Sequence, residues 1–189
     1  MRVGAVLLAA GKSQRMGTPK PLLAFQGETL ATRLVRTLRE GGADEVILVT
    51  GPGTVLSVPG AKTVLNPEPE RGMLSSVQVG LVELPGSAAL LVCPCDLPLL
   101  LPEHVAAVVT NWDGDAEALI RPMRLGKGGH PALFGPGLRD EILSLDPTRY
   151  GLNVLQKKYR CTDIQVEDDG PFLDADTPAD WAKITHGRL

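Results

Sequence analysis

Residues Leu8–Lys20 combine glycine with three cations, as expected of a loop that binds phosphate. The segment runs Leu-Ala-Ala-Gly-Lys-Ser-Gln-Arg-Met-Gly-Thr-Pro-Lys. Glycine lets the backbone approach an anion closely, so that main-chain N–H groups can point at phosphate oxygens. The side chains that can offset the charge of a triphosphate are Lys12, Arg15 and Lys20. The segment is not a Walker loop, because Thr18 follows Gly17 where that motif has lysine. A solvated basic connection between a strand and a helix is the simpler alternative.

Two groups of carboxylates have the setting expected of metal ligands. Asp96 follows a continuous apolar run at 88–93, and the carboxyl end of a central strand is where α/β enzymes place such ligands. Asp174 and Asp176 come just before a helix that Thr177 and Pro178 predict to start there. Acids also suit the positive end of a helix dipole, so capping is the alternative explanation for both groups.

Two further polar segments have the composition of substrate-contacting turns. Residues 72–76, Gly-Met-Leu-Ser-Ser, begin a helix, where hydroxyl groups and unpaired backbone N–H groups could bond a base or a sugar. An ordinary helix N-cap is the alternative. Residues 128–131, Gly-Gly-His-Pro, form a tight approach to a short strand, and a lone histidine such as His130 more often has a structural role.

The elements that must position these residues follow from hydrophobic periodicity. We expect strands at 2–8, 45–50, 61–65, 88–93, 118–121, 131–134 and 161–166. We expect helices at 29–40, 75–84, after Pro102, at 138–145 and at 178–184. This alternation predicts a three-layer α/β fold with a mostly parallel sheet, formed by residues 1–189 as a single domain. Ligands of such sheets bind beyond the carboxyl ends of the strands, here after Leu8, Thr50, Leu65 and Val92.

Composition excludes several other classes of protein. Apolar residues make up 43% of the 189 residues, charged residues 22%, and the net charge is -3, which argues against a broadly basic nucleic-acid-binding surface. Three cysteines do not make a disulfide framework. No apolar run approaches the roughly 20 residues needed to cross a bilayer. The N-terminal run ends without a signal-peptide cleavage pattern, so we expect a cytoplasmic protein.

Taken together and in chain order, these motifs resemble the nucleotidyltransferases of molybdenum cofactor maturation. The resemblance is greatest to the cytidylyltransferase branch, which joins CTP to molybdopterin. The opening signature L-A-[AG]-G-x-[SG]-x-R-M-G-x-x-K is complete from Leu8 to Lys20. The later matches are Asn66-Pro67, 72–77, Asp96-Leu97-Pro98, 129–134 and 174–178. Cys95 departs from the family, which usually has glycine before the metal-binding aspartate, and this leaves the acceptor open.

The resemblance implies a Rossmann-like nucleotide-diphospho-sugar transferase fold with one antiparallel strand, and a Mg²⁺-dependent transfer of CMP from CTP to molybdopterin that releases pyrophosphate. Ala10 favours CTP over GTP. The implied catalytic residues are Lys20, Arg15 and Asp96. The implied nucleotide-binding residues are Leu8, Ala9, Ala10, Gly11, Lys12, Ser13, Arg15, Lys20, Asn66, Gly72, Ser75 and Ser76. The implied metal ligands are Asp96 and Asp176, with Asp174 as the alternative to Asp176. The implied acceptor side consists of Cys95, Gly129 and His130.

Two other functions are compatible with the same residues. One is the same mechanism with another acceptor, such as a phosphosugar or phospholactate, or with GTP and molybdopterin. The other is a non-enzymatic carrier that binds nucleotide or pterin and passes it to a molybdoenzyme client. In neither case do we expect a nucleic acid or a membrane as a partner.

Overall fold

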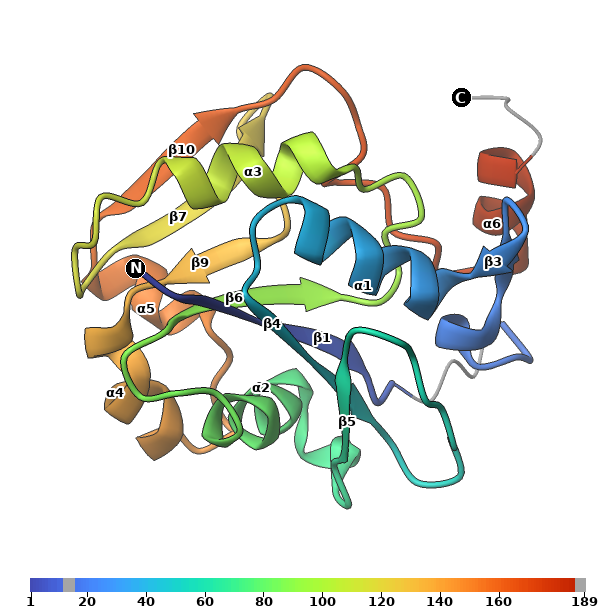
Figure 1. The fold of residues 1–189 in the computed structure, drawn as a ribbon, viewed down its shortest axis with the longest axis horizontal. Helices are drawn as coiled ribbons and strands as arrows, with labels where there is room; N and C mark the ends of the chain where they lie inside the picture. The colour runs from blue at the N-terminus through green and yellow to red at the C-terminus, as the bar shows by residue number, and fades with distance from the viewer. Residues whose placement is uncertain (12–15, 186–189) are drawn as a thin grey trace.

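A computed structural model of the protein, which describes residues 1–11 and 16–185, places one large sheet between layers of helices (Figure 1). The strands of its main path are β1 (Val3–Ala9), β4 (Glu45–Thr50), β5 (Lys62–Leu65), β6 (Ala89–Pro94), β7 (Leu119–Arg124), β9 (Ala132–Phe134) and β10 (Cys161–Gln165). Their order across the sheet is β10-β7-β9-β6-β1-β4-β5, and the short β8 (Lys127–Gly128) pairs with β7. A separate two-stranded sheet joins β2 (Ala24–Phe25) to β3 (Glu28–Thr29).

The sheet is mostly parallel, as predicted. β1 pairs in parallel with β4 and β6, and the pairs β4–β5 and β7–β10 are also parallel. Within the main path, β9 runs antiparallel to both of its neighbours, β6 and β7. Every residue of β1 and β6 is buried, because helices cover both faces of a parallel sheet and its central strands are therefore continuous apolar runs.

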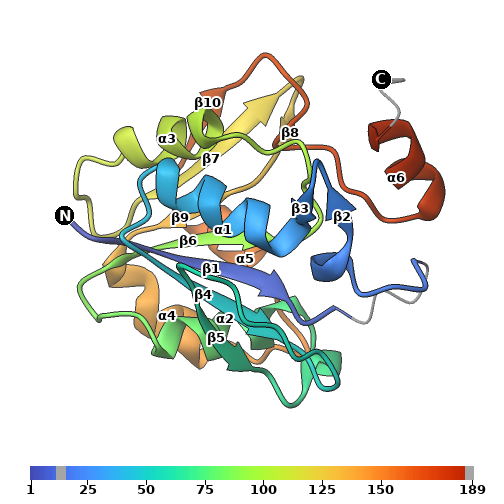
Figure 2. The same cartoon turned by 45° about the vertical axis from the view of Figure 1, so that its right-hand side comes forward.

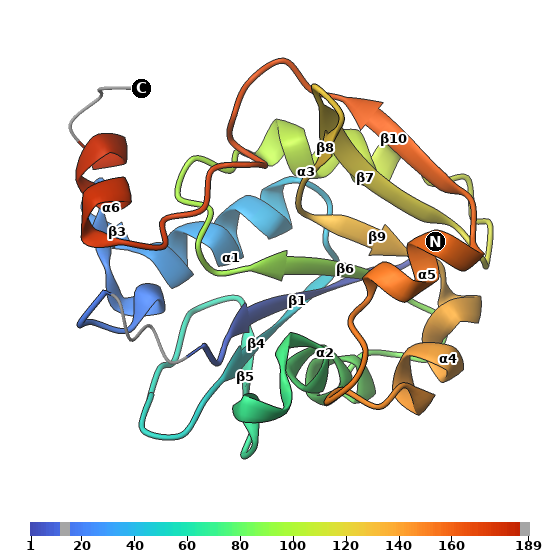
Figure 3. The same ribbon diagram turned by 180° about the vertical axis from the view of Figure 1, so that it is seen from behind.

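Helices cover both faces of this sheet and confirm the three-layer prediction (Figures 1 and 3). One face packs against α1 (Leu30–Glu40) and α3 (Pro102–Thr110). The other packs against α2 (Met73–Val82), α4 (Arg139–Ser144) and α5 (Asn153–Lys158). Successive strand residues point to opposite faces, so Leu7 of β1 joins the first core and Leu8 joins the second.

The start of α1 shows how local sequence fixes an element. The hydroxyl of Thr29 accepts a hydrogen bond from the backbone N–H of Thr32 at 3.2 Å, which satisfies one of the donors left unpaired at a helix start. Leu30, Leu34 and Leu38 then recur at helical spacing and are fully buried.

Some elements differ from the sequence-based expectation. α2 begins at Met73 rather than Ser75 because Gly72, with a φ of 105°, reverses the chain directly before it, a conformation that favours glycine. The helix α5 was not predicted, since its six residues contain one buried side chain, Leu155, and show no periodicity. The β2–β3 hairpin was missed because its strands have two residues each.

The helix α6 (Pro178–Thr185) packs beside the β2–β3 hairpin (Figure 2). Phe25 of β2, Ala175 and Ile184 form a small buried cluster there, and Trp181 packs against it. The predicted N-cap is confirmed: Thr177 Oγ1 accepts from the Asp180 N–H at 3.2 Å, and the Asp180 carboxylate accepts from the Thr177 N–H at 3.0 Å. This anchored helix fixes the end of the segment that carries Asp176.

Within the described residues, no helix combines the length and apolarity that crossing a bilayer would require.

Candidate active site

A pocket of about 420 Å³ lies at the carboxyl ends of β1 and β6, where the strand alternation predicts a ligand site. Both strands point toward the side of the molecule that carries α6 and β3 (Figure 2). Leu8 and Pro94 are opposite each other in the parallel register, and the Cys95 N–H donates to the Leu8 carbonyl at 3.0 Å. The described residues that line the pocket are Leu8, Ala9, Ala10, Gly11, Lys20, Pro21, Pro69, Met73, Ser76, Pro94, Cys95, Asp96 and Asp176.

Lys20 joins two carboxylates at this pocket. Its ammonium donates to Asp176 Oδ1 at 2.6 Å and to Asp96 Oδ2 at 3.0 Å. The side chain of Lys20 is 17% exposed, that of Asp96 23% and that of Asp176 44%. The backbone supports this arrangement, because the Ala175 N–H donates to the Asp96 carbonyl at 2.8 Å and so holds the two acidic loops together.

The charges at this cluster reinforce one another. Burial lowers the pKa of the Lys20 ammonium, but its hydrogen bonds to Asp176 and Asp96 and its attraction to both carboxylates outweigh burial, so the pKa lies above its ordinary value. Lys20 therefore remains a cation at neutral pH.

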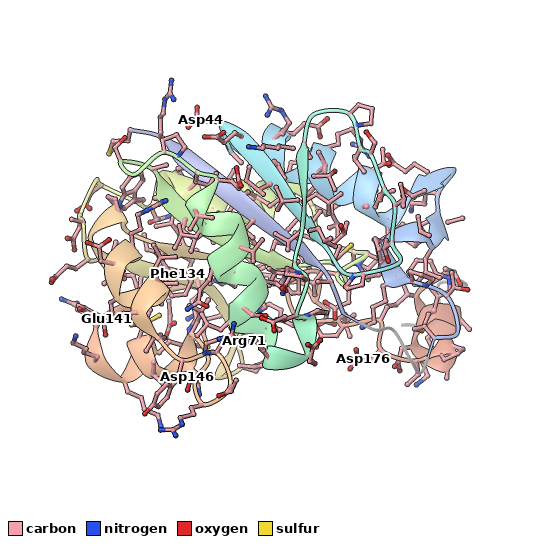
Figure 4. The ribbon with its side chains drawn as sticks, turned by 90° about the horizontal axis from the view of Figure 1, so that it is seen from below. Asp44, Arg71, Phe134, Glu141, Asp146 and Asp176 are labelled. Carbon is pink, nitrogen blue, oxygen red and sulfur yellow. The ribbon has the colours of Figure 1, made fainter. Side chains whose placement is uncertain are left out.

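Figure 4 shows Asp176 toward the α6 side of the molecule, away from Phe134 in the packed layers.

Asp96 and Asp174 differ from Asp176 in their contacts. Asp96 Oδ1 is buried and accepts no hydrogen bond from any residue that the structure describes. Asp174 is exposed and does not contribute to the described pocket lining. The protein around its carboxylate, together with the negative charge of Asp96, still raises the pKa of Asp174, and Lys127 partly offsets that increase. Of the two candidates for second metal ligand, Asp176 is thus the one at the pocket.

Asn66 is not part of the described pocket lining but forms hydrogen bonds with residues at the pocket wall. It is 2% exposed, and its side-chain amide donates to the hydroxyls of Ser75 and Ser76 at 2.9 Å each. Its carbonyl oxygen accepts from the Glu68 N–H at 3.0 Å. The Ser75 hydroxyl donates to the Gly72 carbonyl at 2.7 Å. This network fastens the segment after β5 to the start of α2 and places Ser76 at the pocket.

The predicted acceptor residues separate into two places. Cys95 lines the pocket, and burial together with the negative charge of Asp96 raises the pKa of its thiol well above the ordinary range, so it is a neutral thiol. Gly129 and His130 are not part of the described lining. Gly129 lies so close to Phe172 that an added Cβ would come within 2.6 Å of its ring. Burial lowers the pKa of His130, and the Val92 backbone and the Asp96 charge act against that shift.

The structure brings nine of the predicted nucleotide, metal and acceptor residues to one pocket. Those that line it are Leu8, Ala9, Ala10, Gly11, Lys20, Ser76, Cys95, Asp96 and Asp176. Those that lie elsewhere in the described chain are Asn66, Gly72, Ser75, Asp174, Gly129 and His130. Lys12, Ser13 and Arg15 lie outside the described residues. Binding by each of these residues remains a prediction.

Four lining residues were not predicted, namely Pro21, Pro69, Met73 and Pro94. Met73 could have been found, since it stands inside the segment 72–76 that we selected for its hydroxyl groups. The three prolines have no side-chain chemistry to mark them. Among the described residues, the segment after β4 contributes nothing to the lining. Gly51 in that segment nevertheless lies close to Ala10, since a Cβ added at Gly51 would lie 2.8 Å from the Ala10 carbonyl oxygen.

The donor set of the pocket fits a hard divalent cation. Carboxylate oxygens are the ligands that Mg²⁺ and Mn²⁺ prefer, and Asp96 and Asp176 already enclose one positive charge, the Lys20 ammonium. Within residues 1–11 and 16–185, no group of three or more His, Cys, Asp or Glu side chains is placed to hold a metal ion. A metal held by two carboxylates would take its remaining ligands from a bound substrate or from water, as Mg²⁺ commonly does.

Comparison with known proteins identifies the family. The model of the MobA-like NTP transferase domain matches residues 5–162, well over half of the chain. The chain belongs to the MobA-like NTP transferase family. It is accordingly a nucleotidyltransferase-family enzyme, as the resemblance of the ordered motifs implies.

Three relatives of this MobA-like chain illustrate the range of names in the family. A probable molybdenum cofactor guanylyltransferase of Opitutus terrae is 39% identical over 66% of this chain and 57% of its own length. Nicotine blue oxidoreductase of Paenarthrobacter nicotinovorans is 29% identical over 93% of this chain and 92% of its own length. The molybdenum cofactor guanylyltransferase of Xanthomonas euvesicatoria is 26% identical over 96% of this chain and 93% of its own length. These names give no support to the predicted cytidylyltransferase branch.

Solved structures match the fold of this MobA-like chain. Rv0371c of Mycobacterium tuberculosis is 24% identical, with a TM-score of 0.86 over 98% of this chain and 99% of that one. A second structure of Rv0371c, in complex with manganese, has a TM-score of 0.78. The 2-C-methyl-D-erythritol 4-phosphate cytidylyltransferase of Thermus thermophilus is 18% identical, with a TM-score of 0.73 over the whole of both chains. The predicted nucleotidyltransferase fold is thereby confirmed.

Proposed function

We propose that this protein transfers a nucleoside monophosphate from a nucleoside triphosphate to a phosphorylated molybdopterin-type acceptor and releases pyrophosphate. The observation that carries the proposal is the Lys20 ammonium between Asp96 and Asp176, in the pocket that the segment Leu8–Gly11, the end of β1 and the start of the following loop, also lines. A cation and two carboxylates beside a glycine-containing loop are the parts needed to hold a triphosphate together with its metal.

The chemistry asks the protein for position and charge rather than for a base. The attacking phosphate of the acceptor is already an anion, so its attack on the α-phosphorus needs no strong proton acceptor. Lys20 would neutralise charge that builds up on the phosphate oxygens, and the Leu8–Gly11 backbone would fix the phosphates in place. Arg15 stays a predicted second cation of this loop.

Asp96 and Asp176 would hold a divalent cation, for which Mg²⁺ is our proposal. Such an ion, when bound, withdraws charge from phosphate oxygens. The manganese complex of Rv0371c supports a divalent cation in a protein of this fold. Asp176 is proposed ahead of Asp174 because it lies at the pocket and contacts the same ammonium as Asp96.

The nucleotide is proposed to be GTP, on the support of the guanylyltransferase names of two relatives. The same names support molybdopterin as the acceptor. CTP is the second candidate and is favoured by Ala10 in the first loop. The side chain of Cys95, which lies at the pocket next to Asp96, is the feature that would adjust the fit of the acceptor.

The experiment measures pyrophosphate release from GTP, CTP, ATP and UTP with Mg²⁺, with and without molybdopterin, after a thermal-shift screen of the four nucleotides. We expect release that depends on the acceptor and is fastest with GTP. Lys20→Met should lower turnover about 100-fold or more, the scale of losing one charged group that stabilises a transition state.

Lys62→Met is the matched control, because Lys62 also pairs with a carboxylate, that of Glu83, but stands on β5 outside the pocket. It should keep near wild-type turnover. Near-normal transfer by Lys20→Met would refute the assigned role of the pocket. Binding of nucleotide without any pyrophosphate release would instead favour the carrier function.

A further inference from the structure

Resting on the proposed function, we propose that the Lys20 ammonium and a divalent cation exclude each other at the Asp96–Asp176 pair. The metal would then bind tightly only after a triphosphate has drawn Lys20 away from the carboxylates. The order of events would be built into the pocket: phosphate first reaches the lysine, and the freed carboxylates then accept the metal.

The contacts of Lys20 place it where the metal would have to bind. Its ammonium contacts Asp176 Oδ1 at 2.6 Å and Asp96 Oδ2 at 3.0 Å. The other Asp96 oxygen, Oδ1, is buried, so the carboxylate presents to the pocket the same oxygen that the lysine holds. A metal entering from the pocket therefore meets an ammonium at both carboxylates. Repulsion between two cations a few Å apart is strong in a partly buried site, where screening by water is weak.

The described residues place two carboxylates, those of Asp96 and Asp176, where such a metal would bind. In the described part of the chain, no cluster of three or more His, Cys, Asp or Glu side chains could complete a coordination shell. Mg²⁺ in nucleotide enzymes is commonly held by one or two carboxylates together with substrate phosphates. A triphosphate on the Leu8–Gly11 segment would thus act twice, as a new partner for Lys20 and as a source of metal ligands.

Lys20 can leave the carboxylates without any movement of its backbone. The Lys20 carbonyl accepts from the Leu23 N–H at 3.1 Å within a short 3₁₀ turn, and Pro21 next to it is buried. The four-carbon stem above this fixed point is flexible. Leu8–Gly11 and Lys20 line the same pocket, so a phosphate bound by the loop lies within the region that the side chain can sample.

The test is a Mn²⁺ titration of the protein without nucleotide, in which the signal of free Mn²⁺ is followed by electron paramagnetic resonance. Wild type should bind Mn²⁺ weakly. Lys20→Met, which removes the charge and keeps the length, should bind it at least about ten-fold more tightly, a typical size for coupling between two ligands. Lys20→Arg, which keeps the charge, and Lys62→Met, outside the pocket, should both remain as weak as wild type. Adding Asp96→Asn to Lys20→Met should remove the gain.

Two results would overturn the inference: an unchanged Mn²⁺ affinity in folded Lys20→Met, or tight Mn²⁺ binding by wild type before nucleotide is added. The second result does not depend on whether the variant folds. The inference and the proposed function fail separately. Absence of nucleotide binding and turnover, with the Mn²⁺ titrations as expected, would refute the function alone. Turnover by the wild type that is lost in Lys20→Met, together with an unchanged Mn²⁺ affinity of Lys20→Met, would refute the inference alone.

Discussion

Replacement of Asn66 by alanine should destabilise the protein strongly, because this one side chain makes several hydrogen bonds. The buried amide makes three hydrogen bonds, to the Ser75 and Ser76 hydroxyls and from the Glu68 N–H. At about 1 kcal/mol net for each bond, Asn66→Ala should lower the free energy of unfolding by about 3 kcal/mol. The Ser75 and Ser76 hydroxyls left behind are buried, which keeps the expected loss from falling much below this value.

Urea unfolding followed by circular dichroism measures this change directly, provided that the variant and the wild type have the same m-value, the slope of the unfolding free energy against urea concentration. In a chain of this size, about 3 kcal/mol corresponds to a fall in Tm of roughly 6–12 °C. Asn153→Ala is the matched control, because Asn153 is exposed on α5 and its replacement should change stability by no more than about 0.5 kcal/mol. The nucleotide-induced thermal shift should also shrink in Asn66→Ala, since Ser76 loses its anchor at the pocket.

A loss below about 1 kcal/mol would refute this reasoning, since it would mean that water replaces the amide without penalty. An unchanged nucleotide-induced shift, together with the expected loss of stability, would show that the network supports the fold and not the pocket.

Three further changes test other parts of the structure. Gly80→Ala should lower the free energy of unfolding by about 1–3 kcal/mol through overpacking, because the added Cβ would lie 2.5 Å from a side chain of β1. Gly86→Ala is the control, since its Cβ would meet no atom within 4 Å and should leave stability unchanged. Equal losses of stability in urea unfolding of the two variants would contradict this packing. Leu34→Ala, at a fully buried position of α1, should cost about 2–5 kcal/mol in the same assay, and a loss under 1 kcal/mol, as a rough limit, would show that the core collapses around the gap. Burial raises the pKa of Asp168, but hydrogen bonds from a backbone N–H and from His104 outweigh it and the pKa is lowered. Its stabilising contribution is therefore present above about pH 4 and lost as the pH falls further, and Asp168→Asn should flatten that part of the stability–pH curve; an unaltered curve would exclude this contribution.

Sequence patterns located the parts of the site that lie next to strands. The strands predicted at 2–8 and 88–93 correspond to the buried strands β1 (Val3–Ala9) and β6 (Ala89–Pro94), because long apolar runs between turn signals have few alternatives in an α/β chain. Strand ends meet at one edge of a parallel sheet, so the residues after them, among them Gly11 and Asp96, were expected at one pocket and are found there.

Boundaries and short elements were harder to predict. The start of α2 depends on the conformation of Gly72, and α5 depends on packing a single leucine, Leu155, against the rest of the core. Neither leaves a periodic pattern in the sequence. The CTP preference inferred from Ala10 rested on one side chain, and the names of relatives do not support it.

By itself the sequence determined the α/β fold and the sheet edge at which ligands bind, because strand and helix periodicity are local properties of the chain. The order of the loop and carboxylate motifs carried the resemblance to nucleotidyltransferases. Only the tertiary structure decided which carboxylates meet the lysine. Lys20 and Asp176 are 156 positions apart and yet in contact, through the backbone bond that joins the Asp96 and Ala175 loops and the packing of α6 on the β2–β3 hairpin. Contacts of that range depend on how whole elements dock, and no local pattern encodes them.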